Sequence, residues 1–94
     1  MKVKVLYAGF ITEITGKRQE EVEVPPNTTL RELLNRLAKK YGVKFESEVY
    51  STKEEKLRPG IILLHNGINV KDDLSRSVDN NDFVTLMPPV SGGF

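Results

Sequence analysis

The stretch from Leu30 to Tyr41 constrains the fold most, because it carries the clearest helical pattern in the chain. Its apolar residues recur at helical spacing on one face, while charged residues occupy the opposite face. Thr29 and Glu32 have the spacing of a capping box, which predicts where the helix begins, and Gly42 is placed for a left-handed C-cap. The apolar stripe has to be buried against another element, and core packing is a more common role for such a stripe than partner binding.

Two strands are predicted before this helix. Residues 2–10 are predicted to be a strand, since Val3, Val5 and Tyr7 alternate with Lys2, Lys4 and Leu6, which makes one face apolar and the other mostly polar. Residues 18–24 alternate valine with glutamate, so their acidic side is expected to face water. Residues 11–17 between them are interpreted as a loop, with Gly16 as its turn residue. The two strands should pair as a hairpin, and its apolar side must be covered.

Less regular structure and a second hairpin follow the helix. Residues 43–60 fit one or two short helical turns and then a charged loop. Residues 61–65 form an apolar run that is expected of a strand buried on both faces. The pair Asn66-Gly67 is a strong signal for a two-residue hairpin turn, with residues 68–70 as the short returning strand.

The end of the chain supplies one more strand. Residues 71–82 are polar, with Leu74 and Val78 as apolar anchors, and Phe83–Met87 is predicted as a short apolar strand beside the first one. The element order is strand, strand, helix, strand, short strand, strand. This order predicts an α+β fold of the β-grasp (ubiquitin-like) kind, in which a mixed sheet of about five strands is covered by one main helix.

Composition narrows the classes of function. The chain has 94 residues, which suits one domain, and its formal net charge of +1 does not indicate a partner such as nucleic acid that is held by bulk charge. No apolar run approaches the roughly 18 residues of a membrane span, and the N-terminus does not have the pattern of a signal peptide. We therefore expect a cytoplasmic protein without a membrane contact.

The chain is poor in groups that perform chemistry. It has no cysteine, which excludes a disulfide, a thiolate nucleophile and a cysteine-bound metal. His65 is the single histidine and is interpreted as a strand residue, so we expect no metal site. The carboxylates of Asp72, Asp73, Asp79 and Asp82 lie in polar loops and are interpreted as turn and cap residues. We expect no catalytic residue and no cofactor bound by this chain, and any chemistry must come from a partner.

The last residues differ from the rest of the chain. Two prolines, Pro88 and Pro89, stop strand pairing after Met87 and favour an extended backbone. Small residues follow, so residues 1–88 are predicted to be the β-grasp domain and residues 89–94 a flexible tail. A chain end of this composition is commonly only disordered, but it also suits insertion into a narrow slot of a partner.

The predicted fold and this ending together resemble the small, sulfur-carrying subunit of molybdopterin synthase (MoaD) and the related archaeal small modifier proteins, all of the ThiS/MoaD type. The ending Pro88-Pro89-Val90-Ser91-Gly92-Gly93 is the most specific part of the resemblance, because Gly-Gly alone is a weak signal. The opening strand, the capped leucine helix, the Leu-Arg-Pro-Gly turn at 57–60 and the Asn-Gly pair also match, so the resemblance covers nearly the whole chain.

The resemblance implies a function for the tail. In this family an ATP-using adenylating enzyme of the ubiquitin-activating type activates the terminal glycine carboxylate, and a sulfur donor converts it to a thiocarboxylate. The charged tail then enters a large subunit (MoaE). By position, Gly93 would carry the sulfur, and Gly92 would let the tail pass a narrow channel. Pro88, Pro89, Val90 and Ser91 would lead the tail in.

Phe94 departs from the family pattern, which ends at Gly-Gly with a free carboxylate. Either a protease removes Phe94, which we take as the default, or the tail serves only for docking. The outer side of the last strand, near Phe83 and Met87, is expected to include an apolar surface for the partner, although both residues could instead lie wholly in the core.

Two other functions remain open from the sequence. The chain could be a protein modifier, in which Gly93 forms an isopeptide bond with lysines of target proteins. It could also be a non-covalent interaction module that uses only its β-grasp surface.

Overall fold

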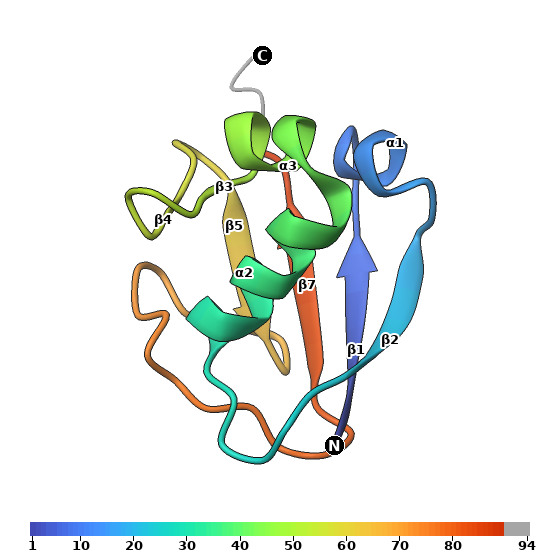
Figure 1. Ribbon diagram of the computed structural model, residues 1–94, viewed down its shortest axis with the longest axis vertical. Helices are drawn as coiled ribbons and strands as arrows, with labels where there is room; N and C mark the ends of the chain where they lie inside the picture. The colour runs from blue at the N-terminus through green and yellow to red at the C-terminus, as the bar shows by residue number, and fades with distance from the viewer. Residues whose placement is uncertain (90–94) are drawn as a thin grey trace.

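The computed structural model describes residues 1–89. The elements follow the order β1 (Lys2–Tyr7), α1 (Ile11–Thr15), β2 (Gln19–Glu23), α2 (Leu30–Tyr41), α3 (Val43–Glu48), β3 (Tyr50–Ser51), β4 (Lys56–Leu57), β5 (Ile62–His65), β6 (Ile68–Asn69) and β7 (Phe83–Met87) (Figure 1). Five strands form one mixed sheet in the order β2-β1-β7-β5-β6, and β3 pairs separately with β4. The β-grasp prediction is confirmed.

The last strand lies at the centre of the sheet. β7 runs parallel to β1, with Val5 opposite Val84, and antiparallel to β5, with His65 opposite Val84. β1 also pairs with β2 as the predicted antiparallel hairpin. Because hydrogen-bonded neighbours flank β7 on both sides, the point where the chain leaves β7 is held by two other strands.

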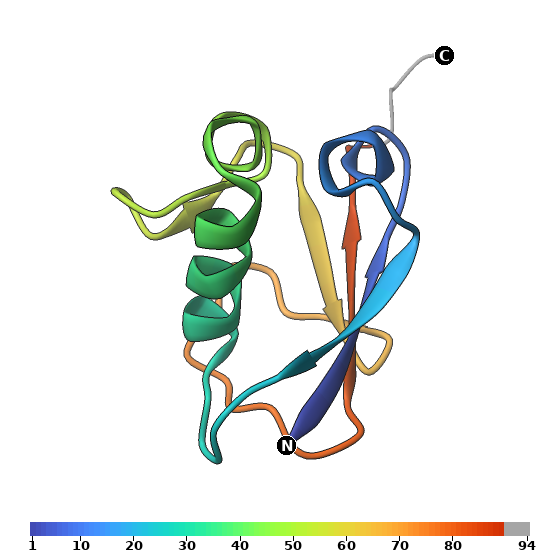
Figure 2. The ribbon, with the colours of Figure 1, turned by 45° about the vertical axis from the view of Figure 1, so that its right-hand side comes forward.

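Helix α2 covers one face of this sheet (Figure 2). Its predicted cap is present: the Thr29 side chain accepts a hydrogen bond from the backbone N of Glu32 at 3.2 Å, and the Glu32 carboxylate accepts one from the backbone N of Thr29 at 2.9 Å. The leucines of the stripe are 0–1% exposed and share one core cluster with residues of the sheet: Leu30, Leu33, Leu34 and Leu37 with Val3, Val5, Leu63, Val84 and Leu86. The stripe is therefore core, as predicted.

Gly42 does not form the predicted left-handed cap. Its φ of 82° is positive, but its ψ of −150° lies outside the left-handed helical region. The backbone N of Gly42 still donates to the carbonyl of Ala38 at 2.8 Å, and α3 begins immediately afterwards. The chain therefore turns directly from α2 into α3 at Gly42.

Two short elements were not predicted. Residues 11–17, interpreted as a loop, contain helix α1, and Gly16 ends this helix in the left-handed conformation (φ 78°, ψ 12°). Ile11 is 0% exposed, so helix α1 places an apolar side chain in the core. The helix was not predicted because five residues are too few to show helical periodicity. The β3–β4 pair within residues 43–60 is likewise too short to leave a pattern.

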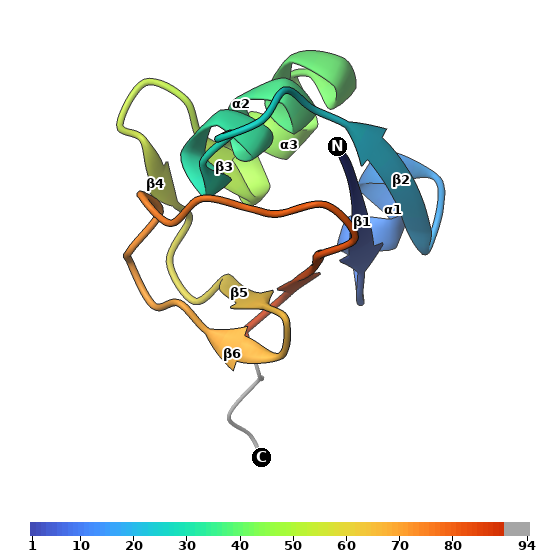
Figure 3. The same cartoon turned by 90° about the horizontal axis from the view of Figure 1, so that it is seen from below.

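Strand β5 also differs from the prediction that it is buried on both faces. Leu63 and His65 are buried, whereas Ile62 and Leu64 are half-buried. Figure 3, seen from below, shows α2 and α3 on one side of the sheet only. Since no helix among residues 1–89 covers the other side, the second apolar pair of β5 keeps contact with water.

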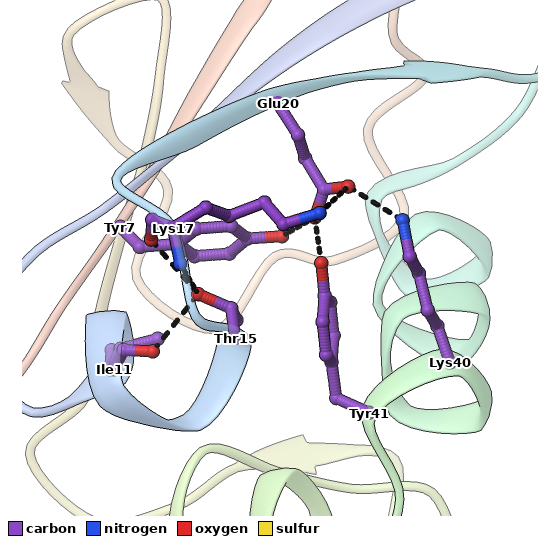
Figure 4. A network of polar contacts seen from close by, with 7 residues as sticks. All are labelled: Tyr7, Ile11, Thr15, Lys17, Glu20, Lys40 and Tyr41. Carbon is purple, nitrogen blue, oxygen red and sulfur yellow. Dashed lines mark hydrogen bonds and ion pairs between the residues drawn. The ribbon is translucent and has the colours of Figure 1, made fainter.

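A polar network ties the end of α2 to the sheet (Figure 4). The Glu20 carboxylate on β2 accepts hydrogen bonds from Tyr7 and Tyr41 at 2.5 Å each and from Lys40 at 2.7 Å, while Lys17 Nζ lies 3.6 Å away. Burial acts to raise the pKa of Glu20, but the hydrogen bonds outweigh burial and lower its pKa from 4.5 to about 2. Burial and the bond to Glu20 raise the pKa of Tyr7, so the phenol remains a neutral donor.

The loop before β7 is held at both ends. Leu74 and Val78 are 3% and 0% exposed, which confirms them as anchors. The Asp82 carboxylate accepts hydrogen bonds from the backbone N of Asp79 at 2.8 Å and from the Asn66 amide at 3.0 Å, and it lies 2.8 Å from His65 Nε2. Asp82 is therefore a turn residue, as interpreted.

Candidate functional site

The candidate site is the region where the chain leaves β7. Val84 and Leu86 are buried, so alternate residues of β7 point to the uncovered face of the sheet. After Met87, the half-buried ring of Pro88 lies beside Gly9, and the ring of Pro89 lies beside Gly60. The predicted strand end at the prolines is confirmed, because β7 ends at Met87. The start of the tail is thus in contact with two loops of the body.

An apolar surface lies next to this region, on the face of the sheet opposite α2. Phe83 is 41% exposed, and Met87 is half-buried. The register places Ile62 opposite Met87, and Leu64 and Leu6 opposite Thr85. We call this set (Leu6, Ile62, Leu64, Phe83, Thr85 and Met87) the open face. Phe83 and Met87 are therefore not wholly core, and partner binding by them stays a prediction.

The remaining predicted tail residues lie outside the described part of the chain. These are Val90, Ser91, Gly92, Gly93 and Phe94. The roles of Gly92 and Gly93, the removal of Phe94 and the boundary between residues 1–88 and 89–94 stay predictions. What the structure adds is the root of the tail: it starts from a central strand, and its neighbours are Gly9, Gly60 and the open face.

Polar groups elsewhere in residues 1–89 are arranged for stability. His65, the last residue of β5, and Asp82, just before β7, lie beside the start of β7, at the opposite end from the tail root. Asp73 accepts hydrogen bonds from the Ser75 side chain at 2.5 Å and from the Ser75 backbone N at 3.3 Å, as a cap residue does. Within these residues, no group of three or more His, Cys, Asp or Glu side chains is arranged to hold a metal. No helix among them is long and apolar enough to cross a membrane.

A groove of about 400 Å³ lies between β2 and α2. Its lining is mostly charged: Glu21, Val22, Glu23, Arg36, Leu37, Lys39 and Lys40. Sequence reasoning missed two parts of the site, Gly9 and Gly60. Glycine after a strand and in a turn is common, so neither residue carried a signal of its role.

Comparison with known proteins gives consistent results. Residues 5–93 match the ThiS family. The molybdopterin synthase sulfur carrier subunit of Drosophila melanogaster is 30% identical over 95 residues, which cover 99% of this chain and 92% of that protein. The corresponding subunit of Caenorhabditis briggsae is 29% identical over 96 residues and covers 99% of both proteins.

The solved structures agree with the sequence relatives. Small archaeal modifier protein 1 (SAMP1) from Haloferax volcanii is similar with a TM-score of 0.84 and 27% identity, covering 99% of this chain and 100% of that one. The similarity therefore extends over the body of the fold and not over a single motif. Since the sequence match also runs from the first strand through the Gly-Gly pair, this chain belongs to the ThiS family.

Proposed function

We propose that this chain is a ubiquitin-like sulfur carrier whose carrier group is the carboxylate of Gly93. The observation that carries the proposal is the family match, which includes the body of the fold and ends at Gly93. The name of the Drosophila relative, a molybdopterin synthase sulfur carrier subunit, supports biosynthesis of the molybdenum or tungsten cofactor as the recipient pathway.

The proposed chemistry takes place in two steps on partner enzymes. First, a carboxylate oxygen of Gly93 attacks the α-phosphate of ATP on an adenylating enzyme of the ubiquitin-activating type, and pyrophosphate leaves. A donor then delivers sulfur as hydrosulfide (HS⁻), which attacks the acyl carbon; the bond from this carbon to AMP breaks, AMP leaves, and loss of the S–H proton gives the thiocarboxylate. Since the chain has no cysteine, its terminal carboxyl carbon is the natural position for transferable sulfur.

The catalytic groups belong to the partners in this proposal, and the chain is a non-catalytic subunit. His65, the single histidine, lies beside Asp82 at the end of β7 opposite Met87, so it is not part of the tail root. The partner in molybdopterin synthesis is a MoaE-like large subunit. We place its contact on the open face, because a 41% exposed Phe83 beside half-buried apolar neighbours suits a desolvated interface.

Phe94 has to be removed before activation can occur. With Phe94 present, the Gly93 carbonyl is part of a peptide bond, so Gly93 has no free carboxylate to activate. A bulky ring would also lie where a glycine backbone has to fit. We therefore expect a protease to precede the adenylating enzyme.

The test uses three forms of the chain, which are full length, ending at Gly93 and ending at Gly92. We expect pyrophosphate release and a gain of sulfur mass only for the form ending at Gly93, with the adenylating enzyme and sulfur donor of the source cells. Intact mass spectrometry of the native protein should find that Phe94 is absent. Activation of the full-length chain at the same rate, with Phe94 retained, would contradict processing. If no form is activated, the non-covalent module becomes the better proposal.

A protein modifier is the second candidate, and the similarity to small archaeal modifier protein 1 favours it specifically. Both functions begin with the same acyl-adenylate, so activation assays do not separate them. Immunoblots of native extracts with an antibody against the chain separate the two functions. Bands of higher mass that resist thiol reagents, and that carry Gly93 on lysine, would support conjugation.

A further inference from the structure

We infer that Gly9 and Gly60 act as positioning residues, which hold the two prolines at the tail root and so set the direction in which Gly93 is delivered. This inference rests on the proposed function. Gly9 follows β1 and Gly60 precedes β5. β7 lies between β1 and β5 (Figure 1). Since one glycine follows β1 and the other precedes β5, the two flank the end of β7. We call the pair the glycine clamp.

The first contact of the clamp is between Gly9 and Pro88. A Cβ atom placed on Gly9 would lie 2.6 Å from Cγ of Pro88 and 3.2 Å from its Cδ. Non-bonded carbon atoms prefer separations of about 3.5–4.0 Å, so the first distance is a clash. The Pro88 ring occupies the space in which any other side chain at position 9 would begin.

The second contact is between Gly60 and Pro89. A Cβ atom on Gly60 would lie 2.6 Å from Cβ of Pro89 and 3.0 Å from its Cγ. These two contacts come from separate loops and act on consecutive residues. Proline fixes its own φ near −65°, so two rings held in succession leave the backbone little freedom of direction.

Both sides of the clamp are tied to the body. The Thr12 hydroxyl, in α1, donates to the carbonyl of Gly9 at 2.7 Å. In the turn that contains Gly60, Arg58 Nε donates to the carbonyl of Glu46, in α3, at 2.8 Å. The loops that contact the prolines are therefore supported by helices, which allows them to resist displacement.

Three other glycines show that a positive φ alone does not explain the clamp. Gly9 and Gly60 have φ values of +57° and +84°, which favour glycine. Gly16, Gly42 and Gly67 have similar values of +78°, +82° and +85°, but a Cβ atom on any of them would have nothing within 4 Å. Only the two glycines of the clamp, within residues 1–89, combine a positive φ with a steric need for a missing side chain.

The direction of the root matters because it sets where the following residues start. Four residues reach at most roughly 13 Å, so a change of roughly 20° at the root would move the end of a fully extended segment of that length by roughly 4 Å. A displacement of about 1 Å is enough to cost 10²-fold in rate when reacting atoms must be aligned. Errors at the clamp should therefore affect activation of the carboxylate more than docking of the body.

The kinetic test uses the chain that ends at Gly93 and its adenylating enzyme. Gly9→Ala and Gly60→Ala should lower kcat for pyrophosphate release at least tenfold, with KM for the carrier changed less than threefold. The matched controls, Gly16→Ala and Gly67→Ala, also place alanine at a positive φ but without the clash, and they should keep kcat within twofold. Equal kcat losses in controls and clamp variants would overturn the inference, since strain alone would then explain them.

A double substitution isolates the contact with Pro88. Alanine at position 88 lacks Cγ and Cδ, and the remaining Cβ would lie 3.6 Å from a Cβ on residue 9, which is an ordinary contact. Gly9→Ala combined with Pro88→Ala should therefore be no slower than Pro88→Ala alone. If the two effects instead multiply, the residues act independently and the clamp is wrong.

A readout without the enzyme keeps the inference separate from the proposed function. In ¹⁵N NMR spectra, the amide signals of Val90 and Ser91 should shift in Gly9→Ala and Gly60→Ala, and should stay in place in Gly16→Ala. This comparison tests the clamp even if no enzyme activates the chain. In that case the proposed function would be wrong, while the clamp would still be judged by the NMR spectra. Unshifted signals in a folded clamp variant would overturn the clamp.

Discussion

The two faces of the five-stranded sheet are built by the same strands but have different surroundings. On the face under α2, Val84 and Leu86 of β7 are 0% exposed, whereas Phe83 on the opposite face is 41% exposed. All three residues are apolar and lie on the same strand, so strand propensity does not account for the difference in exposure. The helix layer accounts for it, since the helices cover one face of the sheet only. One face stabilises the fold, and the other leaves apolar surface exposed along β7, which we propose as the docking surface.

The largest expected effect comes from the covered face. Leu34→Ala should lower the free energy of unfolding by about 2–5 kcal/mol, because it removes a fully buried side chain and leaves a cavity. Urea denaturation measures the loss. Arg36→Ala, on the exposed side of the same helix, is the control and should change stability by less than about 0.5 kcal/mol. A loss below about 1 kcal/mol for Leu34→Ala would mean that this face is not the main source of stability.

The polar network at the end of α2 should give the covered side a dependence on pH. The folded-state pKa of Glu20, about 2, lies below its ordinary value of 4.5, so the charged carboxylate stabilises the fold above that value. This stabilisation is lost as pH falls from about 5 to about 2, and its full size is roughly 3 kcal/mol. Thermal melts across this range should show a steeper loss for the natural chain than for Glu20→Gln.

A neighbouring carboxylate provides the control for that experiment. Glu21 is exposed on the other side of β2, opposite Lys4. Glu21→Gln should therefore leave the slope of stability against pH close to that of the natural chain. Equal slopes for the natural chain and Glu20→Gln would show that the network does not hold Glu20 charged in the folded state.

The smallest effect on stability is expected on the open face. Phe83→Ser should change the free energy of unfolding by less than about 1 kcal/mol, yet it should weaken binding of the large subunit by about tenfold or more. Calorimetry with the purified partner measures the affinity. Val43→Ser is the control, because Val43 is 83% exposed on α3, away from the sheet's open face. Unchanged affinity for Phe83→Ser would remove the open face as the docking surface.

Several parts of the fold were predictable because their signals are local. Thr29 and Glu32 cap a helix through their own spacing, and Asn66-Gly67 turns the chain because both residues accept a positive φ, here 52° and 85°. The helix at Leu30–Tyr41 and the strand at Phe83–Met87 were predicted with the bounds that the structure has.

Other parts were not predictable because contacts with distant residues decide them. Helix α1 is stabilised by burial of Ile11 in the core. The charged carboxylate of Glu20 is stabilised by hydrogen bonds from Tyr7, Lys40 and Tyr41, which lie on two other elements. The uniform apolar run at residues 61–65 suggested burial on both faces, but Ile62 faces outward because no helix covers that side among residues 1–89.

The sequence by itself determined the main helix, the Asn66-Gly67 turn, the order of the main elements along the chain and the chemistry of the ending, because each depends on neighbours along the chain or on residue type alone. Only the tertiary structure decided which glycines meet the prolines. Gly9 and Gly16 look alike in sequence and in φ, and they differ only because β7 brings Pro88 against one of them. Whether a side chain from a distant segment lies against a given glycine depends on the folded arrangement, so no local sequence pattern indicates it.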